Sequence, residues 1–266
     1  MKKKPLLVLA LLMVILSISY VSLQAAMAQT DFNAYKGAAI DDSKIDGSIG
    51  NEWDDAAKYF DVAIDPQGTA TVWTKNDGTN LYIAYQFTAD SGDPWTAVQL
   101  GGNSCMASGA DAALFGNNLP QFSKNGYADC YLSGTGAIRA DATQNGKGAM
   151  TVDSSNVVTV ELKKPLNSGD SAGQDINWTL SETHTLILIW NSNILGSSGG
   201  SVSHSTKGNA LGTATLRTVL INSAEKPSGA TDGQPGFFGL SFVVVLVAII
   251  AIAAVVILAV FLRRRK

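Results

Sequence analysis

Cysteine and histidine are scarce in this chain, whose 266 residues include only two of each. No C-x-x-C-H segment occurs, which excludes a haem attached covalently through thioether bonds. The H-E-x-x-H zinc motif and the phosphate-binding loop are also missing, so the sequence does not support a metallopeptidase or a nucleotide hydrolase. Helical periodicity is scarce between the two ends, which argues against alternating strands and helices.

The amino-terminal end holds one of two long apolar runs without charge. Lys2–Lys4 precede the apolar run Leu6–Leu16, and Ala26-Met27-Ala28 follows as a cleavage site. This order of segments predicts a secretory signal peptide over residues 1–28, removed before Gln29. The remaining domain is therefore expected outside the cytoplasm.

The second apolar run lies near the carboxyl end, over residues 237–262. At 1.5 Å per residue it is long enough to cross a hydrocarbon layer of about 30 Å as one helix. The basic residues 263–266 follow it and are expected to stay cytoplasmic by the positive-inside rule. The sequence thus predicts a single-pass protein of the cell membrane with an extracytoplasmic amino-terminal domain.

Residues 29–221 are short enough for one domain, and residues 222–236, rich in Ser, Gly and Pro, are expected to form a flexible stalk. Seven of the 19 basic residues and none of the 22 acidic residues lie in the two terminal segments. The remainder therefore has 12 basic and 22 acidic residues and a net charge of −10. A surface of this sign makes nucleic acid an improbable partner.

Short segments rich in Val, Thr, Ile and aromatic residues predict β-strands. Thr69–Lys75 and Asn80–Phe87 alternate apolar and polar residues around an Asp-Gly turn, which predicts a hairpin. The spacing predicts an all-β domain, an antiparallel β-sandwich, followed by a single C-terminal transmembrane helix. The other expected strands are Trp95–Leu100, Ala112–Phe115, Asp129–Leu132, Ala149–Val152, Val157–Leu162, Thr185–Trp190 and Gly212–Val219.

Cys105 and Cys130 would face an oxidising compartment, so a disulfide between them is expected, with free thiols as the alternative. Asn177 begins the single N-x-(S/T) sequence, a candidate glycosylation site on a loop at a strand edge.

Two loops carry the candidate ligands of a metal centre. Met106 lies in a loop rich in Gly, Ser and Asn, whereas Met150 begins a strand and is assigned to the core. His204 follows a Gly/Ser-rich loop, whereas His184 heads a strand and is expected to face solvent or a neighbouring strand. A thioether and an imidazole are the axial pair of six-coordinate haem iron in electron-transfer proteins. The loops must meet in space for this to hold.

Several acidic residues could be mistaken for a catalytic pair, but their spacing fits turns and strand ends. A calcium site made from them is conceivable, although no EF-hand spacing indicates one. These residues are Asp111, Glu161, Asp170 and Asp175.

The segment Lys44–Ala56 contains Ile-Asp-Gly and then Trp53. It resembles the opening of the family-nine carbohydrate-binding modules and of the haem-b-binding gamma subunit of ethylbenzene dehydrogenase. The resemblance implies that Trp53 plugs the sandwich and that Asp46-Gly47 makes the first turn.

The middle of the chain is similar to DOMON domains, and the resemblance extends over roughly Lys44 to Leu216. It implies a non-covalent haem b with Met106 and His204 as axial ligands of the iron. The ethylbenzene dehydrogenase branch uses a lysine instead of the histidine, which would nominate Lys207. The matching segments are Trp95–Leu100, Met106, Gly109–Gly116, Asp129–Tyr131, Val158–Asp170 with Asp175, and Ile187–Trp190 followed by His204 and Gly208.

Together these features predict a membrane-anchored b-type cytochrome domain that transfers single electrons to or from an extracytoplasmic or membrane redox partner. It would be an electron carrier or redox-complex subunit and not a stand-alone enzyme. The alternative is a haem-free carbohydrate-binding or adhesion module on the same stalk. That alternative requires two exposed, coplanar tryptophans among Trp53, Trp73, Trp95, Trp178 and Trp190.

Overall fold

The computed structural model describes most of the predicted extracytoplasmic domain, within one compact unit, Thr30–Pro235. The predicted signal peptide, membrane span and basic tail lie outside the described residues. Within the described part of the chain, no helix is long and apolar enough to cross a membrane. The described residues are 31–64, 68–89, 94–104, 107–119, 124–134, 137–170, 174–191, 216–228 and 230.

The described domain is all-β, with short 3₁₀ turns as its helical elements. The 3₁₀ turns are η1 (Asp42–Lys44) and η2 (Asn51–Trp53). The strands are β1 (Phe32–Lys36), β2 (Ala57–Ala63), β3 (Thr69–Asn76), β4 (Asn80–Thr88), β5 (Trp95–Leu100), β6 (Asp111–Leu119), β7 (Lys124–Gly134), β8 (Ala137–Ala140), β9 (Lys147–Val152), β10 (Val157–Pro165), β11 (Thr183–Asn191) and β12 (Arg217–Glu225).

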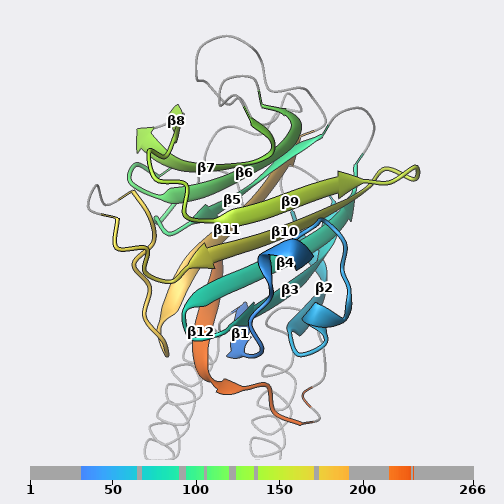
Figure 1. Ribbon diagram of the computed structural model, residues 1–266, viewed down its shortest axis with the longest axis vertical. Helices are drawn as coiled ribbons and strands as arrows, with labels where there is room; N and C mark the ends of the chain where they lie inside the picture. The colour runs from blue at the N-terminus through green and yellow to red at the C-terminus, as the bar shows by residue number, and fades with distance from the viewer. Residues whose placement is uncertain are drawn as a thin grey trace, which may run out of the picture. The chain divides into compact units, whose positions relative to one another are not determined.

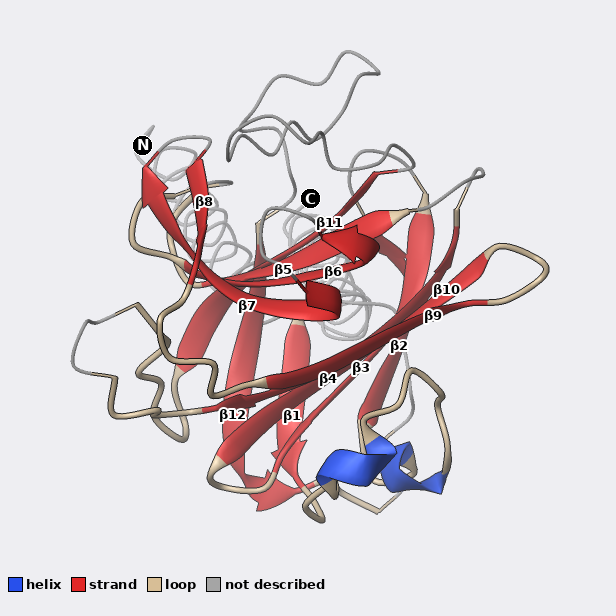
Figure 2. Ribbon diagram, turned by 45° about the horizontal axis from the view of Figure 1, so that its top comes forward, coloured by secondary structure: helices blue, strands red, loops and turns tan. Residues whose placement is uncertain are grey.

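These strands form one continuous sheet that curls over itself (Figure 1). The hydrogen-bonded order is β8-β7-β6-β5-β11-β12-β1-β3-β4-β10-β9, and β2 pairs with β3. In Figure 2 the half that contains β5, β6, β7 and β11 lies across the half that contains β3, β4, β9 and β10.

The main hydrophobic core lies between these two halves, as a sandwich requires. Alternate residues of each strand point into it, because side chains alternate between the faces of a strand. One half contributes Val98, Leu100, Ala113, Phe115, Leu186 and Leu188, and the other contributes Ile83, Tyr85, Val158, Val160 and Leu162. The all-β architecture is thus confirmed and is consistent with a β-sandwich.

The predicted hairpin is confirmed as β3 and β4, and β5 has the predicted bounds. Gly78 adopts a φ of +90° in the hairpin turn, a backbone conformation that favours glycine. The analysis of the sequence missed β1, β2 and β8. Strand β12 also continues to Glu225, so regular pairing extends into the segment expected to be a stalk.

The sheet is not purely antiparallel as expected, because β1 pairs in parallel with both β12 and β3. Side-chain amides fix this strand between its neighbours. Asn76 Nδ2 donates to Ala34 O at 2.5 Å and to Asn222 O at 2.9 Å. Apolar alternation is the same in either direction, so the pattern of residues could not distinguish the two.

The outer face of β3, β4 and β10 is covered by the segment from Ile40 to Ala56, which contains both 3₁₀ turns. Trp53 is 3% exposed and packs there with Trp73 and Tyr82. Trp53 is therefore buried as the resemblance implies. It packs on the outer face of the sheet and not in the main core.

Candidate functional site

The proposed axial ligands Met106, His204 and the runner-up Lys207 lie outside the described residues. Cys105 lies there as well, so its disulfide with Cys130 stays a prediction. The structure does describe Ser104 and Ala107, which flank the Cys105-Met106 pair. It also describes the residues that flank the segment with His204 and the sheet that both loops adjoin.

The half of the sheet that adjoins these loops is apolar on both faces. One face belongs to the main core. The other, which we call the outer apolar face, combines small and large apolar side chains, and every member is at most 8% exposed. It consists of Trp95, Ala97, Ala110, Ala112, Leu114, Ala128, Cys130, Leu132, Ile138, Ile187 and Ile189.

The described members of the outer apolar face all come from this half-sheet, from β8 and from the turn before β6. The other outer surface of the sandwich is covered by Ile40–Ala56, but no comparable described segment covers this one. A strand with one solvated face normally alternates apolar and polar residues. Apolar residues on both faces, all of them buried, therefore indicate that this face is not solvated.

The loop that carries Met106 is fixed to the outer apolar face on both sides. Gln99 Nε2 donates to Gly101 O at 3.0 Å and to Ser104 O at 2.8 Å. Ala107 N donates to Ser104 O at 3.3 Å, and the Ala107 side chain packs against the outer apolar face. The two neighbours of the Cys105-Met106 pair are thus held beside that face.

The segment that carries His204 begins and ends at opposite ends of the same half-sheet. β11 ends at Asn191, which pairs with Trp95 at the start of β5. β12 begins at Arg217, which pairs with Leu186, and Leu186 pairs with Leu100 at the end of β5. The segment from 192 to 216 therefore starts at the end of β11 and leads back to β12, the strand that pairs with β11.

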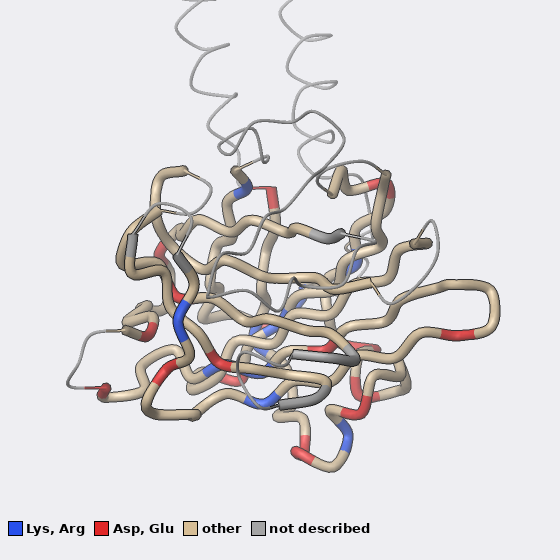
Figure 3. Tube along the Cα trace, turned by 90° about the horizontal axis from the view of Figure 1, so that it is seen from above, with Lys and Arg blue, Asp and Glu red and all other residues tan. Residues whose placement is uncertain are grey.

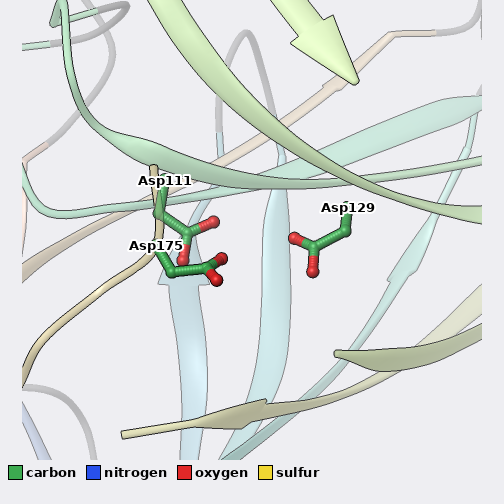
Figure 4. A group of neighbouring side chains, drawn as sticks. All are labelled: Asp111, Asp129 and Asp175. Carbon is green, nitrogen blue, oxygen red and sulfur yellow. The ribbon is translucent and has the colours of Figure 1, made fainter. Parts of the chain in front are cut away.

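Three buried or half-buried acidic residues, Asp111, Asp129 and Asp175, are neighbours in space (Figure 4), and each forms an ion pair with Lys164. Lys164 Nζ lies 2.6 Å from Asp129 Oδ1, 2.7 Å from Asp175 Oδ1 and 3.1 Å from Asp111 Oδ2. In this lysine-centred cluster, Asp111 lies on β6, Asp129 on β7 and Lys164 on β10. It therefore links the two halves of the sandwich.

Within the cluster, the pKa of Asp111 is raised, whereas the pKa of Asp175 is lowered. Burial raises the pKa of Asp111 to about 7, because the attraction of Lys164 only partly offsets the loss of water. Burial would lower the pKa of Lys164, but Asp111 and Asp129 raise it overall. Burial opposes ionisation of Asp175, but hydrogen bonds from Lys164 and Asn145 lower its pKa overall.

The Asp111→Asn variant should show a flatter dependence of stability on pH. Because the folded-state pKa of Asp111 is raised from 3.8 to about 7, its stabilising contribution is present at low pH and is lost as the pH rises through 7. Urea unfolding from pH 4 to pH 8 measures this. The exposed Asp42→Asn variant should keep the wild-type slope, and equal slopes for wild type and Asp111→Asn would contradict the prediction.

Glu161 organises the other motif, the Ile-Asp-Gly segment that precedes Trp53. Its Oε1 accepts the Trp53 indole N–H at 2.6 Å. Its Oε2 accepts backbone N–H groups from Asp46 at 2.8 Å, Gly47 at 2.6 Å and Ser48 at 3.3 Å. Burial raises the pKa of Glu161, although the hydrogen bonds from Trp53 and Gly47 oppose the shift. The first turn thus depends on a buried carboxylate.

The structure also describes His184, Met150 and Asn177, which the sequence analysis considered. His184 stacks on Trp178, with ring centroids 4.4 Å apart, and burial lowers the pKa of His184. Met150 is buried in the main core, as expected. Asn177, the candidate glycosylation site, is exposed.

The described tryptophan side chains, those of Trp53, Trp73, Trp95 and Trp178, are all at most 7% exposed. They therefore offer no exposed, coplanar pair for a sugar ring. The side chain of Trp190 is outside the described set.

Acidic residues are spread over many segments of the described domain and are not gathered in one region of the chain trace (Figure 3).

Comparisons with known proteins give a distant likeness. No protein-family model matches the chain, and no curated protein matches it. Similar solved structures include a family-nine carbohydrate-binding module from Caldicellulosiruptor kristjanssonii in complex with cellotriose. Its identity is 12%, its TM-score is 0.42, and the match covers 75% of this chain and 96% of that chain.

A second structure of a family-nine module from the same organism, in complex with glucose, gives a similar result. The identity is 12%, the TM-score is 0.43, and the match covers 74% of this chain and 98% of that chain. Values of this size carry no inference about what the present chain binds.

Proposed function

We propose that the chain is a membrane-anchored, extracytoplasmic b-type cytochrome domain that transfers single electrons. In this proposal Met106 and His204 would bind the iron of a non-covalently held haem b beside the outer apolar face. The observation that carries the proposal is a half-sheet with two apolar faces, one of which packs against Ala107, the residue after Met106.

The composition of the outer apolar face suits a flat macrocycle. Ala97, Ala112 and Ala128 have short side chains, so a planar ligand can approach the sheet closely over them. Ile187 and Ile189 add apolar surface on β11. Burial of such surface against an apolar ring system is favourable by about 25 cal/mol per Å².

The route of the chain also supports the proposal. Residues 192–216 leave β11 after Asn191 and lead into β12, which pairs with β11, so this segment begins and ends at strands beside the outer apolar face. His204 lies near the middle of this segment. The proposal requires an imidazole from this segment and a thioether from the loop beside Ala107 to meet at one ligand.

When bound, haem b would supply one-electron redox chemistry, and two axial protein ligands would leave no open position on the iron for a substrate. Met106 would favour the reduced state, because a thioether raises the reduction potential. The outer apolar face would exclude water from one side of the ligand, which further tunes the potential. Lys207 is the runner-up for the position of His204, but a lysine must lose its proton to bind iron.

The test is the absorption spectrum of the full chain, purified in detergent after expression with haem supplied. We expect sharp α and Soret bands on reduction, and their loss or displacement in Met106→Ala and in His204→Ala. Met150→Leu and His184→Ala are matched controls, because both residues have described structural surroundings away from the outer apolar face. An iron-free wild-type protein would overturn the proposal.

The second candidate is a haem-free carbohydrate-binding or adhesion module. The segment Lys44–Ala56 is consistent with it, because this segment resembles the opening of the family-nine modules as well as that of the haem-b-binding gamma subunit. It predicts a colourless protein that binds glycans. Glycan-array binding by colourless wild-type protein would support this candidate over the cytochrome.

A further inference from the structure

Gln99 is a buried polar residue at one margin of the outer apolar face, and it is 2% exposed. Because side chains alternate along a strand, Gln99 points to the same side of β5 as Trp95 and Ala97. Its neighbours across the ladder are Ala112 on β6 and Ile187 on β11, which both belong to the outer apolar face. A buried amide therefore lies among the apolar side chains of this face.

We propose that Gln99 is the positioning residue for Met106, a role that rests on the proposed function. The amide nitrogen of a glutamine carries two hydrogens. Gln99 Nε2 donates both of its described hydrogen bonds to the loop that carries Met106, to Gly101 O at 3.0 Å and to Ser104 O at 2.8 Å. Leaving a buried donor without its acceptor is costly, so the loop and the amide hold each other in place.

The carbonyl group of Ser104 connects this amide to the residue that follows Met106. Ser104 O accepts from Gln99 Nε2 and also from Ala107 N, at 3.3 Å. Only Cys105 and Met106 separate Ser104 from Ala107 in the sequence. A shift of the Ser104 carbonyl is therefore passed to Ala107 through a single hydrogen bond.

Close packing at Gly102 brings the two arms of the loop together at the same amide. Gly102 has a φ of +80°, and a Cβ atom at this position would lie 2.6 Å from the Cβ of Ala107 and 3.1 Å from Gln99 Nε2. Thr185 Oγ1, on β11, donates to Gly102 O at 2.6 Å. The arm before Met106 and the arm after it therefore meet at Gln99.

Backbone hydrogen bonds fix the arm after Met106 independently of Gln99. Gly109 N donates to Leu132 O at 2.7 Å. Leu132 N donates in turn to Ala110 O at 2.9 Å. Loss of the Gln99 amide should therefore loosen the arm before Met106 and leave the other arm attached to β7. The loop would keep its place on the sheet, but the thioether would be held less firmly.

The experiment measures the imidazole sensitivity of the full chain, loaded with haem in detergent, as the imidazole concentration that displaces the thioether from the oxidised iron. In Gln99→Leu this concentration should fall by about tenfold or more, because two hydrogen bonds that hold the loop are lost. The reduction potential should fall as well, because a weaker thioether bond favours the reduced state less. Gln86→Leu is the matched control and should behave as wild type, because Gln86 Nε2 donates to Thr159 Oγ1 at 3.0 Å between β4 and β10.

Two further readouts separate positioning from a general loss of stability. In the full chain prepared without haem, hydrogen exchange of the Ala107 amide should be about tenfold less protected in Gln99→Leu, whereas Gly109 should keep wild-type protection. Gln99→Glu adds a pH profile, because a carboxyl group can donate a hydrogen bond only when it is protonated. Burial raises the pKa of a carboxyl group, so the imidazole sensitivity of Gln99→Glu relative to wild type should be high at about pH 8 and lower at about pH 5.

The outcomes distinguish this role from the proposed function. An iron-free wild type overturns the proposed function and this role together. A haem-loaded wild type with equal imidazole sensitivity in Gln99→Leu and Gln86→Leu overturns the role of Gln99 alone. If Gln99→Leu does not take up haem, the pH profile of Gln99→Glu decides, and a profile that runs parallel to wild type overturns the role.

Discussion

The Lys164→Met variant should lose about 3–5 kcal/mol of unfolding free energy, the usual effect of removing one partner from a buried ion pair. Lys164 is 0% exposed and faces Asp111, Asp129 and Asp175. Without the ammonium, these carboxylates would repel one another, and the ion pairs that link β10 to β6 and β7 would be lost. Urea unfolding near neutral pH measures the change.

Lys163→Met is the matched control for this prediction. Lys163 is the preceding residue on β10, and it pairs with Asp42, whose side chain is 65% exposed. Exposed pairs of this kind contribute about 0–1 kcal/mol, so the control should unfold almost as wild type does. The prediction is contradicted if the two methionine variants have similar stability.

The Glu161→Ala variant should be destabilised by about 3 kcal/mol or more, because several buried donors lose their acceptor at once. Glu161 is 0% exposed and accepts from the Trp53 indole and from three backbone N–H groups. The segment Ile40–Ala56 should then detach from the outer face of β3, β4 and β10. A red shift of tryptophan fluorescence and the loss of unfolding free energy report this change.

Glu52→Gln is the control for Glu161→Ala, because Glu52 lies in the same covering segment and its half-buried side chain accepts one solvent-exposed hydrogen bond, from Gly50 N–H, at 2.6 Å. Its effect should stay within about 0.5 kcal/mol. A Glu161→Ala protein that keeps the stability and fluorescence of wild type would show that the first turn does not depend on this carboxylate.

Local patterns predicted most of the strands. Alternation and turn chemistry located the β3–β4 hairpin and β5, because these depend on neighbouring residues alone. The parallel position of β1 was not predictable in this way, because it depends on amide contacts from Asn76 and Asn222 far along the chain.

Lys164 and Glu161 are buried charged residues of β10, and the sequence indicated the burial of Lys164 but not that of Glu161. Lys163-Lys164-Pro165 has the composition of a solvated strand end. Yet Lys164 has the same parity as Val160 and Leu162, which places it on the inward face. Glu161 has the opposite parity and is buried only because Ile40–Ala56 covers that face, which no pattern within β10 reveals.

The candidate haem site was predicted from the loops of Met106 and His204, whereas the described structure contributes the sheet beside them. The sequence did contain the corresponding signal. Apolar residues occupy successive positions at Ala97-Val98 of β5 and throughout Ile187-Leu-Ile of β11. A strand with one solvated face would alternate apolar and polar residues there.

The parallel pairing of β1 with β12 determines how the domain would respond to tension on its chain. Phe32 lies beside Val219 and Lys36 beside Glu225, so the chain enters β1 at one end of the pair and leaves β12 at the other. A pull on both chain ends would slide the two strands past each other. Their hydrogen bonds would then share the load and break together instead of opening one by one like a zipper, which is the geometry that resists mechanical rupture best.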